Sequence, residues 1–413
     1  MLANVFCHNY LTKSLSWLHT KTRNTLISHV QSVLGGHAQL TLTSIGRHLP
    51  GKSKVKHKIN RCWRFLSNTK LHTEQVALYK SLSAPVLAPL NELLIAVDWT
   101  GCCSADTHML RASLVHTGRS IPIYNEIHSQ KDLGTDKVHK HFLNRLKAVL
   151  PEGKRVVIIT DAGFKTPWFT SVRKLGWYFT GRVSGTINYR LSTDKKWNPL
   201  NTLHALVQRG KTLYVGVGKL GQDSKTRIEV LLTSYWGEKK GRKNPKPKYP
   251  QAEKRYAKMH NEPLIIASNL HQYPSLDGEH NHQALAVLAR DIYCKRMQIE
   301  QNFRDDKSER FGTAWRYSRT EDKNKISVLI LLASIRILIL WMIGFAAEKR
   351  KLHLHFQANT IRTHRVLSFI SLAKQLIIHG FPQFNIRKFS RIITLFQLEF
   401  NENSPFNHLI KGD

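Results

Sequence analysis

The sequence predicts an α/β fold in which a mixed core is flanked by helical regions at both ends. Apolar runs typical of buried strands begin after about residue 90 and then alternate with amphipathic helical segments. Before residue 90 and after residue 350 the pattern is helical throughout. Hydrophobic residues make up 41% of the 413 residues, which excludes a disordered chain and allows two to four domains.

The N-terminal region, residues 1–90, contains two helical segments around a short break. A first helix is predicted over 40–49, with Thr43 or Ser44 as its N-cap, and Pro50 ends it. A second helix is predicted over 55–66. Its apolar positions are Val55, Ile59, Cys62, Trp63 and Leu66, and its cations are Lys54, Lys56, Lys58, Arg61 and Arg64. The pattern resembles a helix-turn-helix. A solvated charged face explains this segment equally well on its own.

The core begins after Pro85 and Pro89, which indicate a linker. Strands are predicted over 93–98, 109–116, 120–128, 155–163 and 177–183, with helices over 135–150 and 167–175. Three strands that can form an antiparallel meander are therefore followed by crossovers that add parallel strands. This order is the plan of a ribonuclease-H-like domain.

A β-rich insertion interrupts the core. It contains strand candidates over 212–219 and 227–234 and a basic, Pro-rich loop over 237–258. A further strand over 263–270 and a long helix over 284–307 follow. We predict five regions: helical 1–90, first core part 91–184, β-rich insertion 185–270, second core part 271–350 and helical 351–413.

The segment 326–347 is apolar and long enough to span a bilayer. Arg336 lies at its centre, where a charge costs roughly 2.5–3.5 kcal/mol. We therefore expect a helix buried in a large domain, with Arg336 paired or at a surface that binds a partner, and no membrane partner.

The composition indicates a polyanion as partner. Lys and Arg number 63 against 28 Asp and Glu, a formal net charge of +35. Nucleic acid is the simplest such partner, although composition alone does not separate DNA from RNA or an anionic membrane surface. Five Cys without a CxxC pair, and an N-terminus without a secretory pattern, predict a protein of the reducing cytoplasm.

Three carboxylates are candidate metal ligands. Asp98 and Asp161 each end a predicted core strand, and Glu300 lies in the long helix. Strand ends can meet at one rim of a sheet, and three carboxylates there can hold two Mg²⁺ ions about 3.5–4 Å apart. Taken singly, a strand-ending Asp is more often a turn residue, and a helical Glu is usually solvated. The matched contexts of the two Asp in a strongly basic chain favour catalysis.

The long helix carries a set of polar residues at helical spacing. Tyr293, Arg296, Glu300 and Lys307 stand at offsets of 3, 4 and 7, which fall on one helical face. Such a face can bind metal and phosphate oxygens together. The alternative is that these residues form exposed salt bridges within the helix. Each such pair would stabilise the helix by only tenths of a kcal/mol.

The Tyr-Arg-Glu-Lys spacing resembles the signature of DDE transposases of insertion sequence family four. The matching segments are VDWT at 97–100, TDAGFKTPWF at 160–169 and YCKRMQIEQNFRDDKS at 293–308. The stretches at 110–124, 174–183 and 355–362 are most similar to the group around the Tn-ten transposase. The resemblance covers about residues 40–365.

The resemblance implies cut-and-paste transposition of double-stranded DNA by a homodimer on paired transposon ends, in the cytoplasm with the nucleoid. Asp98, Asp161 and Glu300 would hold two Mg²⁺ ions, with Mn²⁺ as a substitute. Tyr293, Arg296 and Lys307 would contact phosphates near the cut, and the cations of the second N-terminal helix would grip the terminal inverted repeat. We also expect Arg182 to contact DNA.

One position departs from the family pattern. Members can place a Trp in the strand before the glutamate helix, where it holds a flipped base during hairpin formation. Leu264 stands there in this chain. An apolar side chain can still wedge between bases, but it stacks less well than an indole. Two alternatives to a transposase stay open: a structure-specific nuclease of the same fold, and a non-catalytic DNA-binding derivative.

Overall fold

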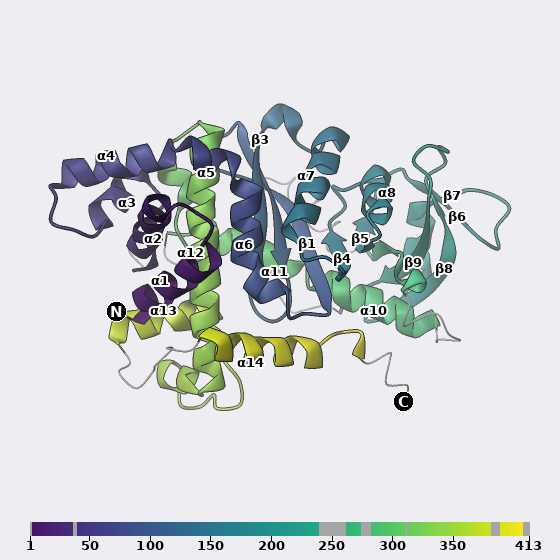
Figure 1. Cartoon of the computed structure of the whole chain (residues 1–413). Helices are drawn as coiled ribbons and strands as arrows, with labels where there is room; N and C mark the ends of the chain where they lie inside the picture. Colours follow the sequence, from purple (N-terminus) through teal and green to yellow (C-terminus); the bar gives the residue numbers. More distant parts are fainter. Residues whose placement is uncertain are drawn as a thin grey trace, which may run out of the picture. The chain divides into compact units, whose positions relative to one another are not determined.

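The computed structural model describes residues 2–35, 39–238, 262–273, 282–309, 312–380 and 389–407. They form two compact units. The first unit contains Met1–Lys154 and Met297–Glu402, and the second contains Arg155–Arg296 and Asn403–Asp413. Figure 1 labels most of the elements of both units. The predicted loop over 237–258 lies, from residue 239 onward, outside the described residues.

The first unit begins with the predicted helical region. Its helices are α1 Leu2–Ser14, α2 Thr20–Leu34, α3 Leu42–His48, α4 Val55–Leu66, α5 Thr69–Thr73 and α6 Gln75–Leu87 (Figure 1). Two local predictions are wrong. The N-cap of α3 is Thr41, whose Oγ1 accepts the N–H of Ser44 at 3.2 Å. Pro85 lies inside α6 rather than in a linker, because the apolar residues around it are buried and hold the helix together.

The long apolar segment forms α12 (Lys323–Lys349) at the centre of the first unit. It packs against α2, α13 (Phe369–His379) and strand β3 (Ile121–Ser129). Among the described helices it alone is long and apolar enough to cross a membrane, and 94% of its apolar window is buried inside the protein. Arg336 is 2% exposed, and its Nε donates to the carbonyl oxygen of Val33 at 2.8 Å. The prediction of a buried helix with a paired arginine is confirmed.

The first unit also holds the predicted meander. Strands β1 (Glu92–Gly101), β2 (Thr107–Leu114) and β3 lie in the order β3-β2-β1, each antiparallel to its neighbour. Helix α7 (Asp136–Val149) follows, and its N-cap Thr135 accepts the N–H of Val138. Helix α11 (Met297–Lys307) packs against β1. The described C-terminal part of the unit adds α13 and α14 (Phe389–Glu402).

The second unit is built on a sheet in the order β4-β5-β10-β9-β8-β6-β7. Its strands are β4 Arg155–Thr160, β5 Tyr178–Val183, β6 Asn188–Leu191, β7 Asn198–Pro199, β8 Thr212–Leu220, β9 Ile228–Tyr235 and β10 Leu264–Ser268. Helix α8 (Thr166–Lys174) connects β4 to β5, which run parallel as predicted. The remaining pairs are antiparallel. Helix α10 (His282–Cys294) packs on the sheet.

Candidate active site

Asp98 lies inside β1 rather than at its end. The strand continues through Trp99 and Thr100, both good strand formers that a search for apolar runs passes over. Asp98 is 9% exposed, and its Oδ1 accepts the N–H of Trp99 at 2.8 Å. It pairs in register with Arg111 of β2. Because directly opposed residues share a face of the sheet, Asp98 and Arg111 lie on the same side.

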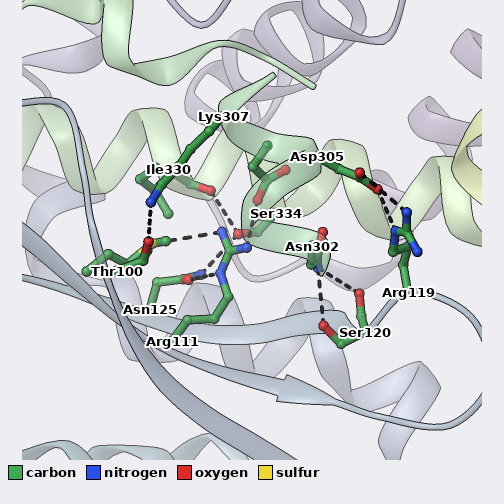
Figure 2. A network of polar contacts seen from close by, with 12 residues as sticks. Thr100, Arg111, Arg119, Ser120, Asn125, Asn302, Asp305, Lys307, Ile330 and Ser334 are labelled. Atoms are coloured by element: carbon green, nitrogen blue, oxygen red, sulfur yellow. Dashed lines mark hydrogen bonds and ion pairs between the residues drawn. The ribbon is translucent and has the colours of Figure 1, made fainter. Parts of the chain in front are cut away.

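Lys307 of α11 reaches this face of β1. Its Nζ donates to Thr100 Oγ1 at 2.5 Å (Figure 2), and Thr100 stands two residues from Asp98, on the same side of the strand. Burial lowers the pKa of Lys307, while the Cys102 thiol and the Asp98 carboxylate are among the groups that raise it. The first unit therefore brings a predicted metal ligand and a predicted phosphate-binding cation together.

Helix α11, which carries Glu300, is tied to β2 and to the turn after it by charged and amide side chains (Figure 2). Arg111 Nη1 contacts Asp306 Oδ2 at 2.7 Å with both side chains almost fully buried. Arg119 Nε contacts Asp305 Oδ2 at 2.6 Å. Asn302 Nδ2 donates to the carbonyl oxygen of Ser120 at 2.8 Å. These contacts fix the position of α11 on the sheet and its rotation about its own axis. They therefore determine the direction in which Glu300 points.

These anchoring residues were not predicted from the sequence. One signal could have found them: Arg111 is a charged residue within an apolar strand, and such a residue needs a buried partner. Acidic residues are scarce in so basic a chain, so the adjacent Asp305 and Asp306 are the natural partners for a buried arginine. Composition cannot say which arginine pairs with which acid, because that depends on how the helix crosses the sheet.

The long helix predicted over 284–307 is interrupted. Helix α10 ends at Cys294 and α11 begins at Met297. The Arg296 N–H bonds to the Tyr293 carbonyl oxygen three residues earlier, the tighter pattern of a helix end. The single helical face predicted for four residues is therefore wrong. Tyr293 belongs to α10, Arg296 stands between the helices, and Glu300 and Lys307 share α11.

Asp161 directly follows β4, where the sequence predicted it. Its Oδ1 accepts the N–H of Gly163 at 2.9 Å. A Cβ on Gly163 would lie 3.0 Å from this oxygen, so the glycine leaves room for the carboxylate. The contact is that of a turn-forming Asp. The Gly163 N–H occupies one of the several hydrogen-bond acceptor positions of the Asp161 carboxylate.

Three further predicted residues gather near Asp161 in the second unit. Burial raises the pKa of Tyr293, the charges of Arg296 and Arg182 lower it, and the charge of Asp161 raises it further. The Arg296 guanidinium lies 5.8 Å from the centre of the Tyr293 ring. Arg182 stands on β5 and lines a cavity of about 360 Å³ together with His204 and Glu262. The second unit therefore combines one predicted metal ligand with three predicted DNA contacts.

The three carboxylates predicted to bind metal are divided between the units: Asp98 and Glu300 in the first, Asp161 in the second. Within the part of the chain that the structure describes, no three His, Cys, Asp or Glu side chains form a metal-binding group. The chemistry of the donor set nevertheless fits Mg²⁺, since each candidate is a carboxylate and hard divalent cations prefer oxygen ligands.

Helices α3 and α4 form the predicted helix-turn-helix-like pair. They pack so closely that a Cβ on Gly46 would lie 2.7 Å from the Cα of Ile59. The buried residues of α4 are Cys62, Phe65 and Leu66. Val55 and Trp63 were predicted on this apolar face, but they are 50% and 52% exposed. The predicted apolar face is too wide: the covered side of α4 follows Ile59, Cys62 and Leu66, and Val55 and Trp63 lie outside it.

The cations of α4 differ in exposure. Lys54, Lys56 and Arg64 are exposed, whereas Lys58 and Arg61 are half-buried. Arg61 and Arg64 line a cavity of about 310 Å³ with Lys21 and Thr25 of α2. The exposed cations and the exposed Trp63 give α4 a surface suited to a polyanion.

Comparison with known proteins identifies the family. No curated protein matches the chain. A model of the Transposase DDE domain matches residues 92–337, more than half of the chain. The span begins with β1, which carries Asp98, and includes Asp161 and all of α11 with Glu300. The mixed α/β architecture agrees with this domain. The chain therefore belongs to the Transposase DDE domain family.

Proposed function

We propose that this protein is a cut-and-paste DNA transposase of insertion sequence family four, close to the group around the Tn-ten transposase. The family implies an enzyme of phosphoryl transfer on DNA. The observation that carries the proposal is that the matched span contains all three candidate carboxylates and the Tyr-Arg-Glu-Lys residues.

We assign Asp98, Asp161 and Glu300 to hold two Mg²⁺ ions, with Mn²⁺ as a substitute. When bound, such ions activate the attacking oxygen and stabilise the leaving oxygen of a phosphodiester. The anchored α11 keeps Glu300 at a defined position, which catalysis by positioning requires. Lys307, beside Asp98, supplies a cation for a phosphate oxygen.

The proposed reaction has four steps: hydrolysis of one strand, attack of the new 3′-OH on the opposite strand to form a hairpin, reopening of the hairpin, and joining to target DNA. Each step is a displacement at phosphorus, so one set of residues can serve all four. Tyr293, Arg296 and Arg182, which lie near Asp161, would hold the phosphates beside the cut. Leu264, half-buried at the start of β10, would be the wedge during hairpin formation.

Recognition of the transposon ends is assigned to α3 and α4. A basic helix can enter a major groove and present side chains to base edges. We assign the end contact to the cations of α4 as a group, some at base edges and others at backbone phosphates: Lys54, Lys56, Lys58, Arg61 and Arg64. We further propose that a homodimer acts on paired ends, in the cytoplasm with the nucleoid.

An assay with Mg²⁺ on paired ends, made from the DNA that flanks the gene, tests the proposal. A transposase cuts the ends and joins them to target DNA, a nuclease only cuts, and a binding protein does neither. Asp98→Ala, Asp161→Ala and Glu300→Ala should each abolish cleavage while end binding persists in a gel shift. Glu152→Ala removes an exposed acid of the first unit and should leave cleavage intact. A triad variant that still cleaves would remove that residue from the site.

A further inference from the structure

A basic cavity of about 310 Å³ lies between α2 and α4 in the first unit. None of the residues assigned to metal binding lines it. Lys21 comes from the first turn of α2, and Arg61 and Arg64 come from the last two turns of α4. Thr22 and Thr25 add hydroxyl groups on the α2 side. Helix α2 has 15 residues, and its N-terminal end adds the partial positive charge of its backbone.

The charged groups that line this cavity are all cations. Its lining contains one lysine and two arginines and no carboxylate. Phe65 forms part of the wall, and the His29 ring stacks on it with centroids 3.9 Å apart. Burial lowers the pKa of His29 to about 4, so this neighbour is neutral at pH 7. No anion therefore balances the three cations within the lining.

Arg61 also carries an unsatisfied donor. Its Nε is buried and has no hydrogen-bond partner among the described residues. A buried N–H without an acceptor destabilises the protein, and more so when the group is charged. A guanidinium beside a second arginine and a lysine suits a phosphate, which can accept several charge-assisted hydrogen bonds at once.

We infer that this cavity is a phosphate-binding site, formed by Lys21, Arg61 and Arg64, that takes one backbone phosphate of bound DNA. The identity of that DNA as a transposon end rests on the proposed function. A phosphate contact positions a protein on the duplex but carries no sequence information directly. The site therefore anchors α4 on the backbone, and it recruits α2, which the sequence pattern did not connect with DNA.

Lys21→Ala in the full-length protein tests this site. Lys21 is exposed, so its loss should not disturb the fold. Affinities for an end duplex and a random duplex are measured over a salt series. The slope of log affinity against log salt should fall by up to about 0.9, the value of one fully lost phosphate contact, because Arg61 and Arg64 stay at the phosphate. Both affinities should weaken by the same factor. Lys13→Ala, which removes an exposed lysine of α1 outside the cavity, is the matched control and should leave the slope unchanged.

A methylphosphonate scan of the end duplex identifies the phosphate. Replacing one phosphate at a time should reveal a position whose neutralisation weakens binding by the wild-type protein more than binding by the Lys21→Ala variant. If no position shows this coupling, or if Lys21→Ala weakens end binding alone, the assignment is wrong. If the wild-type protein neither prefers ends nor cleaves them, the proposed function fails, while the salt slope on random DNA still decides the phosphate site.

Discussion

Asp161 makes the same local contact as an ordinary turn residue elsewhere in the second unit. Its Oδ1 accepts the N–H two residues later at 2.9 Å, and Asp223 does the same with Lys225 at 2.9 Å. Local geometry therefore cannot separate a metal ligand from a turn residue. The difference lies in position: Asp161 follows a core strand close to Tyr293, whereas Asp223 stands in an exposed turn.

This pair allows a matched test of catalysis. An asparagine keeps the oxygen that accepts the backbone N–H, so Asp161→Asn and Asp223→Asn should both fold normally. If Asp161 binds metal as proposed, Asp161→Asn should lower the cleavage rate by at least about 100-fold, because the proposed site would lose one carboxylate ligand. Asp223→Asn should cleave like the wild type. Equal rates for both variants would make Asp161 a turn residue only.

Lys374 on α13 is a half-buried cation with a depressed pKa. Its pKa is lowered from the ordinary 10.5 to about 7, mainly by burial and also by the charge of Arg336, while Asp305 and Asp306 oppose the shift. Between about pH 7 and 10.5 the unfolded chain therefore binds more protons than the folded protein. By proton linkage, this group makes the folded state more stable as pH rises through that interval.

Lys374→Met should remove this part of the pH dependence. The stability of the wild type should rise relative to that of the variant between about pH 7 and 10, by at most about 1.4 kcal/mol per pH unit. Chemical unfolding of both proteins at several pH values measures it. Parallel stability curves would show that Lys374 has no depressed pKa.

At the scale of elements, the position of α11 depends on its buried ion pair. Asp306 is buried, which raises the pKa of its carboxyl group, and Arg111 counteracts this. Arg111→Ala would leave the carboxylate buried without its cation, at a cost of about 3–5 kcal/mol. The double variant Arg111→Met with Asp306→Leu should lose less stability than the single variant, because no charge stays buried. A thermal unfolding cycle compares them; a larger loss in the double variant would contradict this account.

Close packing of α3 against α4 leads to a second prediction at this scale. Gly46→Ala should destabilise the pair by about 1–3 kcal/mol, because the new Cβ meets the backbone of Ile59, which cannot rotate away. End binding should weaken as the pair loosens. Gly35→Ala is the control, since a Cβ there meets nothing within 4 Å. Melting temperatures and gel shifts measure both effects, and an unchanged Gly46→Ala variant would disprove the close packing.

At the scale of the whole molecule, the net charge of +35 should act mainly on affinity. The segment 237–258, predicted from the sequence to be a loop, contributes Lys239, Lys240, Arg242 and Lys243. Neutralising all four should lower the salt slope by up to about 3.6, at about 0.9 for each contact, and weaken end and random DNA equally. Changing Lys58 should instead erode the preference for ends. If the loop variant loses that preference, the two roles are reversed.

The order of elements from β1 to β5 could be predicted because each strand is a compact apolar run and each helix has a clear amphipathic pattern. The position of Asp161 followed directly from the end of such a run. The break between α10 and α11 could not be predicted, because Lys295 and Arg296 are compatible with a continuous helix. The missed end of β1 has a similar cause, since Asp98 ends the apolar run but not the strand.

The fold class, the basic character and the three candidate carboxylates could be predicted from the sequence, because these depend on local pattern and residue type. Which polar residues are buried together depends on the packing of the whole chain. It buried α12 and Arg336 where length and hydropathy alone allow a membrane helix. It also joined Arg111 to Asp306, 195 positions apart in the chain, and so anchored the helix of Glu300. Such pairings depend on the way distant elements pack, which local periodicity does not contain.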